Sequence, residues 1–214
     1  MYNGLAVVAL SNCRNYTPVT DANKEITVYK NYHMKTNKKD WLKFSVGFIV
    51  CLLFRFLPFR PPNIEPILAA QMPFARVYGS IAGFSFAFFG IVVYDFLTSG
   101  LGMWTLVTAV TYGLLGLWAV AYFKNKKNSS LDYVKFAIIS TILFDAVTGL
   151  SIGPLFFHQS FSVALAGQIP FTLLHLLGNS AFAFLLSPII YNFILKKKIP
   201  DKNKFTYAFN PRTI

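Results

Sequence analysis

Acidic residues are scarce in this chain of 214 residues: eight Asp and Glu stand against 20 Lys and Arg, and charged residues make up only 13% of the sequence. Average soluble proteins carry about 25% charged residues. Hydrophobic residues account for 55% and aromatic residues for 17%, and the mean hydropathy is +0.49. This composition excludes an ordinary soluble domain and predicts a membrane protein.

The sequence has few cysteines and lacks a nucleotide-binding motif. The two cysteines, Cys13 and Cys51, occur in unrelated contexts, which argues against a disulfide framework and a zinc site. The sequence has no glycine-rich loop followed by Lys and Ser or Thr, so the chain cannot drive transport with ATP by itself. We therefore predict no metal site and no cofactor.

The sequence contains several long apolar segments with few charged residues. A helix needs roughly 20 apolar residues to cross about 30 Å of hydrocarbon, and six segments approach that length: 41–58, 64–75, 79–98, 104–123, 131–148 and 169–195. The second segment is short and bounded by proline. We predict an all-α integral membrane protein whose membrane domain, 41–197, contains six transmembrane helices.

Residues 149–168, between the last two segments, are apolar but interrupted by Gly, Pro, Ser and His. We interpret this stretch as a re-entrant or cap-like loop at membrane depth, where surrounding protein or a cavity satisfies its backbone groups. A seventh, partial span is the alternative.

Basic residues indicate the orientation, because Lys and Arg accumulate on the cytoplasmic side of membrane proteins. They cluster before the first segment, between the fourth and fifth, and after the last, whereas the opposite side has only Arg55 and Arg60. Both termini are therefore expected in the cytoplasm. We attribute the net charge of +12 to this orientation and to anionic lipid rather than to nucleic acid, because no base-stacking aromatics accompany the lysines in a folded domain.

The two ends of the chain differ from the membrane domain. Residues 1–40 mix polar and β-branched residues without a helical period and are expected to be a disordered extension, and 198–214 form a basic cytoplasmic tail. "MKTNKKDWLKF", which begins at Met34, resembles a bacterial N-terminus, so we hypothesise that translation begins there. N-terminal sequencing of the native protein tests this, and a chain that begins at Met1 would contradict it.

Three acids lie in or beside the predicted helices, where a charged side chain is costly and usually faces protein or water. Asp95 and Asp145 each stand three residues before a threonine, in the pattern Asp-x-x-Thr, near the predicted outer ends of their helices, and Glu65 enters the second helix from the same side. Residues three apart share a helix face, so Thr98 and Thr148 are expected to point with their acids. Two interpretations stay open: packing alone, or the lining of a binding site.

Further polar and aromatic residues are expected on this outer side, among them Arg55 and Arg60. From the whole group we predict a substrate-binding site formed by Asn63, Glu65, Asp95, Thr98, Trp104, Asp145, Thr148, His158, Gln168, His175 and Asn179. His175 and Asn179 are four residues apart and share a helix face. For a single member such as His175, a hydrogen bond between helices is the alternative to ligand contact.

Four stretches carry a resemblance to a known family. "PNIEPILAA", "GSIAGFSFAFFGIVVYDFLTSGLGMWTLVTAVTYGLLG", "DAVTGLSIGPLFFHQSF" and "GQIPFTLLHLLGNSAFAFLLSP" are similar to the substrate-binding S components of energy-coupling factor (ECF) transporters, over about residues 41–197. The resemblance implies six membrane helices in the bacterial plasma membrane and a vitamin or other organic micronutrient bound in an outward pocket. It also implies a transmembrane coupling subunit and two ATPase subunits as partners.

Two departures from that family affect the expected partners and ligand. Many S components carry Ala-x-x-x-Ala on the first helix, where the coupling subunit docks, and the nearest small pair here is Gly47 and Cys51. Members that take up nickel or cobalt begin with Met-His, whereas this chain begins with Met-Tyr. An organic substrate is therefore expected, with Trp104 and Phe157 stacking on it.

Other classes of function are also considered. "GLSIG", residues 149–153, matches the Gly-x-Ser-x-Gly pattern of hydrolases, but that pattern requires a strand before the serine and a helix after it. We predict that the chain is not an enzyme and that Ser151→Ala retains function. A stand-alone secondary transporter or channel, and a membrane protein of structural role, are the remaining alternatives.

Overall fold

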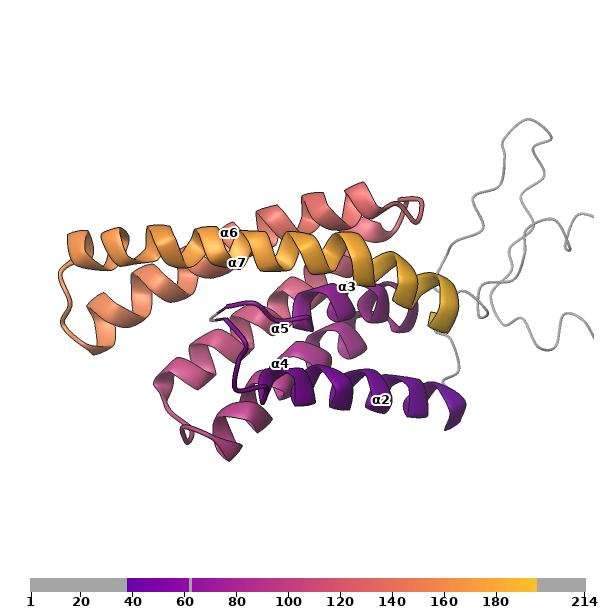
Figure 1. Cartoon of the computed structure of the whole chain (residues 1–214), viewed down its shortest axis with the longest axis horizontal. Helices are drawn as coiled ribbons and strands as arrows, with labels where there is room; N and C mark the ends of the chain where they lie inside the picture. The colour runs from indigo at the N-terminus through magenta and orange to yellow at the C-terminus, as the bar shows by residue number, and fades with distance from the viewer. Residues whose placement is uncertain (1–37, 62, 196–214) are drawn as a thin grey trace, which may run out of the picture. The chain divides into compact units, whose positions relative to one another are not determined.

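The structure, a computed structural model, describes residues 38–61 and 63–195, and in these ranges every regular element is a helix (Figure 1). The elements are α2 (Lys38–Arg55), α3 (Ile67–Tyr78), α4 (Ser80–Leu97), α5 (Met103–Phe123), α6 (Ser130–Phe156), α7 (Phe161–Ile189) and the π-helix η1 (Ile190–Leu195). The predicted all-α class is confirmed. The predicted N-terminal extension, the start at Met34 and the basic tail lie outside the described residues.

Four helices are long and apolar enough to cross a membrane: α4, α5, α6, and α7 continued into η1 as far as Asn192. They correspond to the third, fourth, fifth and sixth predicted segments. Helix α2 carries charged residues near both ends, from Asp40 to Arg55. Helix α3 has 12 residues and spans only about 18 Å.

Helix α3 lies at the centre of the bundle rather than at its surface. Ten of its 12 residues are buried, and it packs against α2, α4, α5, α6, α7 and η1. A helix that is apolar on all sides is stable where other protein surrounds it. The short, proline-bounded segment is therefore a core helix, and its neighbours separate it from the surroundings of the bundle.

One buried side chain of α3 joins it to two neighbouring helices. The amide nitrogen of Gln71 donates hydrogen bonds to the carbonyls of Gly83 in α4 and Tyr112 in α5, both at 2.9 Å. Helices α4 and α5 cross so closely here that a Cβ on Gly116 would lie 2.2 Å from the carbonyl oxygen of Gly83. The crossing therefore requires glycine, because the two backbones touch.

The stretch that we predicted to be a re-entrant or cap-like loop is mostly helical, so its predicted extent is wrong. Helix α6 continues through Gly149, Gly153 and Pro154, and α7 already begins at Phe161. Glycine and proline weaken a helix in water, but in apolar surroundings an unpaired backbone group costs more than an imperfect helix. Residues 157–160 alone connect the two helices.

The end of α6 is formed by His158 and its neighbours. The φ angle of His158 is 52°, in the left-handed region that glycine usually occupies after a helix. The amides of Phe157 and Gln159 donate back to the carbonyl of Gly153, at 3.1 and 3.2 Å. Because α6 extends this far, the expectation that Asp145 lies near a helix end is also wrong: it lies well inside α6.

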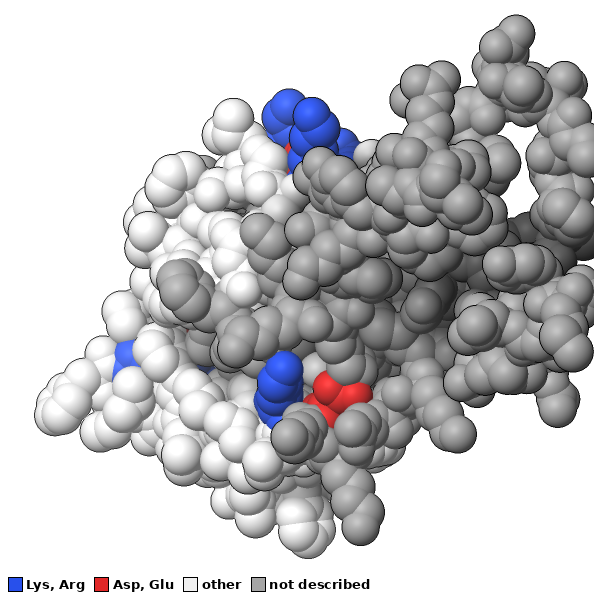
Figure 2. All heavy atoms as spheres, turned by 90° about the vertical axis from the view of Figure 1, so that its right-hand side faces the viewer, with Lys and Arg blue, Asp and Glu red and all other residues white. Residues whose placement is uncertain are grey.

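The chain connections define two ends of the bundle. The α2–α3, α4–α5 and α6–α7 connections lie at one end, which we call the cavity end, and the α3–α4 and α5–α6 connections lie at the other, which we call the terminal end (Figure 1). Figure 2 looks onto the terminal end and shows basic side chains, with acidic ones beside them, at its surface.

Arg76, in the last turn of α3, holds the terminal end together. Its guanidinium donates hydrogen bonds to the carbonyls of Lys126 and Lys127, which follow α5, and to the hydroxyl of Tyr133 at 3.3 Å. It also lies 4.6 Å from the centroid of the Tyr191 ring. Carbonyls near the C-terminus of a helix carry partial negative charge, so they stabilise the arginine without a carboxylate.

The small residues of α2 face the core of the bundle. A Cβ on Gly47 would lie 2.7 Å from the ring of Phe74 in α3, and Cys51 is buried. Large side chains occupy the free side of α2, among them Val46 and Ile49. The pair that the sequence offered as a docking point for a coupling subunit is therefore covered by the protein itself.

Candidate functional site

A cavity of about 350 Å³ opens toward the cavity end and is lined by residues of five helices and of the α2–α3 connection. Its lining residues are Arg55, Arg60, Asn63, Glu65, Ile91, Asp95, Trp104, Thr108, Tyr112, Phe144, Phe171 and His175. Small-molecule sites typically have volumes of about 300–1,000 Å³ and combine apolar walls with a few placed polar groups. The cavity has both properties.

Two arginines meet one carboxylate on the α2–α3 side of the cavity. The Nε atom of Arg55 lies 3.1 Å from Oε2 of Glu65, and Nη1 of Arg60 lies 3.9 Å from the same oxygen. The Arg55 guanidinium also lies 4.1 Å from the centroid of the Tyr94 ring. Glu65 is buried, and such burial is tolerated because opposite charges lie beside the carboxylate. Ion pairs therefore fix this part of the wall.

Asp95 closes the turn between α4 and α5 and also lines the cavity. Its Oδ2 accepts a hydrogen bond of 2.6 Å from the hydroxyl of Thr105, which in turn accepts one of 3.2 Å from the amide of Gly102. The Asp95 carbonyl accepts a hydrogen bond from the amide of Gly100 at 2.7 Å. One carboxylate oxygen thus holds the turn.

Trp104 follows this turn and forms an aromatic wall of the cavity. A Cβ on Gly102 would lie 2.2 Å from the indole ring, so the indole rests directly against the backbone of the turn. The side chain is 39% exposed, which leaves part of its surface open to a ligand.

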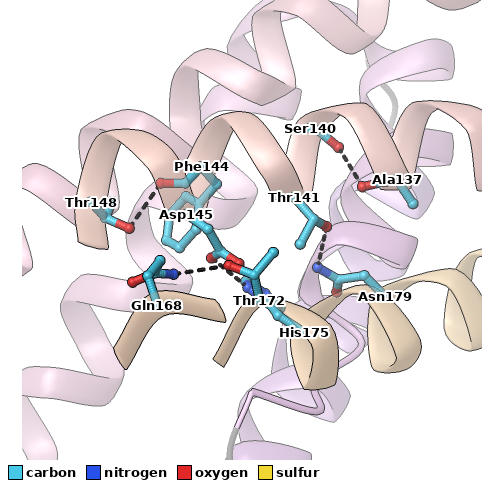
Figure 3. A network of polar contacts seen from close by, with 10 residues as sticks. All are labelled: Ala137, Ser140, Thr141, Phe144, Asp145, Thr148, Gln168, Thr172, His175 and Asn179. Carbon is cyan, nitrogen blue, oxygen red and sulfur yellow. Dashed lines mark hydrogen bonds and ion pairs between the residues drawn. The ribbon is translucent and has the colours of Figure 1, made fainter. Parts of the chain in front are cut away.

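Two contacts between polar side chains join α6 and α7 beside the cavity (Figure 3). Oδ1 of Asp145 lies 2.8 Å from Nδ1 of His175, and Nδ2 of Asn179 donates to Oγ1 of Thr141, also at 2.8 Å. All four side chains are buried. Hydrogen bonds of this kind hold membrane helices in register, and here one of them orients a residue of the cavity wall.

The structure brings five of the eleven predicted site residues together in the cavity wall: Asn63, Glu65, Asp95, Trp104 and His175. Two more, Asp145 and Asn179, lie one layer behind the wall on the α6–α7 contact. Contact of any of them with a substrate stays a prediction.

The remaining four predicted residues lie away from the cavity. The hydroxyls of Thr98 and Thr148 donate to carbonyls four residues earlier in their own helices, not to the acid of their motif. His158 is exposed at the α6–α7 connection, as is Phe157. Gln168 lines a separate, mostly aliphatic hollow of about 270 Å³ between α6 and α7.

Several lining residues were not predicted as part of the site. Helix periodicity contains a signal for three of them: Thr108 and Tyr112 follow Trp104 by four and eight residues, and Phe171 stands four before His175. Residues at this spacing share a helix face. The arginines of the first connection were placed on the correct side, but their contact with a carboxylate depends on the tertiary structure.

A comparison with protein families identifies the family of the chain. The model of the ECF-type riboflavin transporter S component matches residues 46–187, which is about two thirds of the chain. The chain belongs to this family. Searches of curated proteins and of solved structures gave no match.

Membership in the S-component family makes the chain a multi-pass membrane protein of a transporter and not an enzyme. The family implies a small-molecule substrate and partner subunits of an ECF module. Ser151, the serine of "GLSIG", lies inside α6 and donates a hydrogen bond to the carbonyl of Val147. It therefore lies within a helix, whereas a hydrolase nucleophile of this pattern follows a strand.

Proposed function

We propose that the chain captures riboflavin in the cavity and passes it to an ECF-type coupling module for uptake. The observation that carries this proposal is a cavity lined by both aromatic and hydrogen-bonding side chains, inside the region that matches the riboflavin S-component family.

The chemistry of riboflavin suits the residues of the cavity wall. Its three fused rings form a flat aromatic surface, and Trp104, Tyr112 and Phe171 supply aromatic side chains against which such a surface packs. Its ring carbonyls and ribityl hydroxyls need hydrogen-bonding partners, and Asn63 and Thr108 have suitable groups. The ligand is thus matched in both its apolar and its polar parts.

The charges of the cavity wall favour a ligand without net charge. Arg55 and Arg60 lie beside Glu65, and Asp95 supplies a second acid. Because two positive and two negative side chains line one cavity, a strongly charged ligand would disturb a balanced set. Riboflavin is uncharged at neutral pH.

We further propose six membrane spans, with α2 and α3 added to the four long helices, in the plasma membrane of a bacterial cell. The cavity end faces outward and both termini lie in the cytoplasm. Lys124, Lys126, Lys127 and Lys135 support this orientation, since all lie at or near the α5–α6 connection of the terminal end and basic residues mark the cytoplasmic side.

Binding of riboflavin to the purified chain in lipid nanodiscs tests the proposed ligand. We expect saturable quenching of riboflavin fluorescence, weakened about tenfold by Trp104→Ala, because aromatic stacking contributes about 1–1.5 kcal/mol. Trp118→Phe is the matched control, since Trp118 packs against Phe136 in the core and does not line the cavity. Absence of riboflavin binding to the unmodified chain would contradict the proposal.

Copurification tests the proposed partners. We expect the tagged chain, expressed in its native host, to bring down a transmembrane coupling subunit and two ATPase subunits. A chain that takes up riboflavin into proteoliposomes without these subunits would instead be a stand-alone transporter.

A further inference from the structure

The imidazole of His175 is held in one orientation. Its Nδ1 lies 2.8 Å from Oδ1 of Asp145, and the rings of Phe144 and Phe171 meet it edge to face, with centroids 5.7 and 6.0 Å away and interplanar angles of 82° and 83°. The side chain is 4% exposed. The ring cannot turn without losing these contacts, so its free edge has a fixed direction.

Asp145 determines which nitrogen of His175 carries the hydrogen. A carboxylate can only accept hydrogen bonds, so Nδ1 is the donor, and Nε2 of the neutral imidazole keeps its lone pair. Within 38–61 and 63–195, the hydrogen bond of His175 runs through Nδ1, while His175 lines the cavity and Asp145 does not. Nε2, on the ring edge away from Asp145, is therefore a hydrogen-bond acceptor available to the cavity.

Each carboxylate of the wall has one oxygen engaged by protein groups. Oε2 of Glu65 is shared by Arg55 and Arg60, and Oδ2 of Asp95 accepts the Thr105 hydroxyl. His175 adds to this wall an acceptor whose direction is fixed by Asp145.

We propose that Nε2 of His175 accepts the hydrogen of the flavin imide N–H, and that Asp145 is the positioning residue that makes this possible. Asp145 acts through His175 rather than on the ligand. A flavin that lacks this hydrogen leaves the buried acceptor unpaired, and that loss weakens its binding. The site therefore selects flavins with a free imide. This assignment rests on the riboflavin binding proposed above.

A pair of ligands that differ by one methyl group tests the assignment. Riboflavin and N3-methylriboflavin are titrated separately into the purified chain in lipid nanodiscs. We expect the unmodified chain to prefer riboflavin about tenfold or more. The ratio of the two dissociation constants is the decisive readout, because a general loosening of the bundle would weaken the binding of both ligands to the same extent and leave the ratio unchanged.

Three variants assign the preference to the pair. Asp145→Leu should lower the affinity for riboflavin about tenfold and leave the affinity for N3-methylriboflavin nearly unchanged, so that the preference disappears. His175→Phe should have the same effect. Asp145→Asn should retain most of the preference, because its amide oxygen can still accept the Nδ1 hydrogen. If Asp145→Leu fails to fold, the comparison of His175→Phe with the unmodified chain still gives the ratio.

Thr141→Val is the matched control on the same two helices. It removes the hydrogen bond between Thr141 and Asn179, which is buried and one turn away on α6, without touching His175. We expect an unchanged preference for riboflavin. Equal affinity of the unmodified chain for the two ligands, or an equal loss of preference in Thr141→Val and Asp145→Leu, would overturn the roles of His175 and Asp145 while riboflavin binding stands. A chain that binds neither ligand would overturn the proposed function as well.

Discussion

The hairpins α4–α5 and α6–α7 each contain an Asp-x-x-Thr pattern, but different contacts hold them together. In α4–α5 the backbones touch at Gly83 and Gly116, and Asp95 closes the turn. In α6–α7 the acid Asp145 lies inside a helix and reaches across to His175. The same pattern therefore serves a turn in one hairpin and a contact between helices in the other.

The difference teaches what each hairpin contributes to the site. A contact between backbones fixes the distance between two helices but offers no chemical group. A contact between polar side chains fixes the position of individual atoms, such as the nitrogens of His175. The helices of hairpin α4–α5 are thus held by their backbones, and those of α6–α7 by oriented side-chain atoms.

The largest effect is expected where the backbones of α4 and α5 touch. Gly116→Ala should lower the free energy of unfolding by about 3 kcal/mol, the upper part of the range for overpacking, because the new Cβ would lie 2.2 Å from a carbonyl oxygen that cannot move aside. Unfolding in SDS measures this. Gly167→Ala in α7 is the control, since no atom lies within 4 Å of its added Cβ, and a similar loss in both variants would refute the steric explanation.

A smaller effect is expected on α6–α7. Asp145→Leu should lower the free energy of unfolding by about 2 kcal/mol, because it leaves the buried Nδ1 of His175 without an acceptor. Thr141→Val should cost about 0.6 kcal/mol, the average for polar contacts between membrane helices. The same SDS assay compares the two. Equal losses would mean that the acid is no more important to this hairpin than the neutral contact beside it.

A still smaller effect is expected at the α4–α5 turn. Thr105→Val should lower the free energy of unfolding by about 1 kcal/mol, because Asp95 loses its donor but lies beside a cavity that water can reach. Thr105→Ser keeps the hydroxyl and should restore most of the loss. Thermal unfolding in detergent measures both variants, and failure of serine to restore stability would assign the effect to the lost methyl packing instead.

The smallest effect is expected for the second member of the α4 motif. Thr98→Ala should change the free energy of unfolding by less than about 0.5 kcal/mol and leave riboflavin affinity unchanged, because the Thr98 hydroxyl bonds only to a carbonyl of its own helix and is exposed. Titration with riboflavin checks this. A clear loss of affinity would place Thr98 in the site after all.

The sequence predicted helices α4 and α5 to within a residue at each end, because apolar runs bounded by glycine give a clear signal. It did not predict how far α6 and α7 extend, since Gly149, Gly153 and Pro154 carry the signals of a loop. Those signals describe a helix in water. Where the alternative is an unpaired backbone in apolar surroundings, the helix persists.

The site was predictable where a residue's position along one helix decides its direction. Asp95, Trp104 and His175, which line the cavity, were predicted because polar or aromatic side chains near the outer ends of apolar helices are rare and conspicuous. The place of Asp145 behind the wall depends on how α6 meets α7, and the engagement of Glu65 by Arg55 depends on how the first connection folds back. Neither contact can be predicted from the spacing of residues along one helix.

Arg76 gives the terminal end of the bundle a shared anchor. Its hydrogen bonds run to the carbonyls of Lys126 and Lys127 and to the hydroxyl of Tyr133, and its guanidinium also lies over the rings of Phe123 and Tyr191. One arginine thus joins α3 to α5, α6 and η1, so loss of its side chain should loosen the ends of several helices together rather than one contact alone.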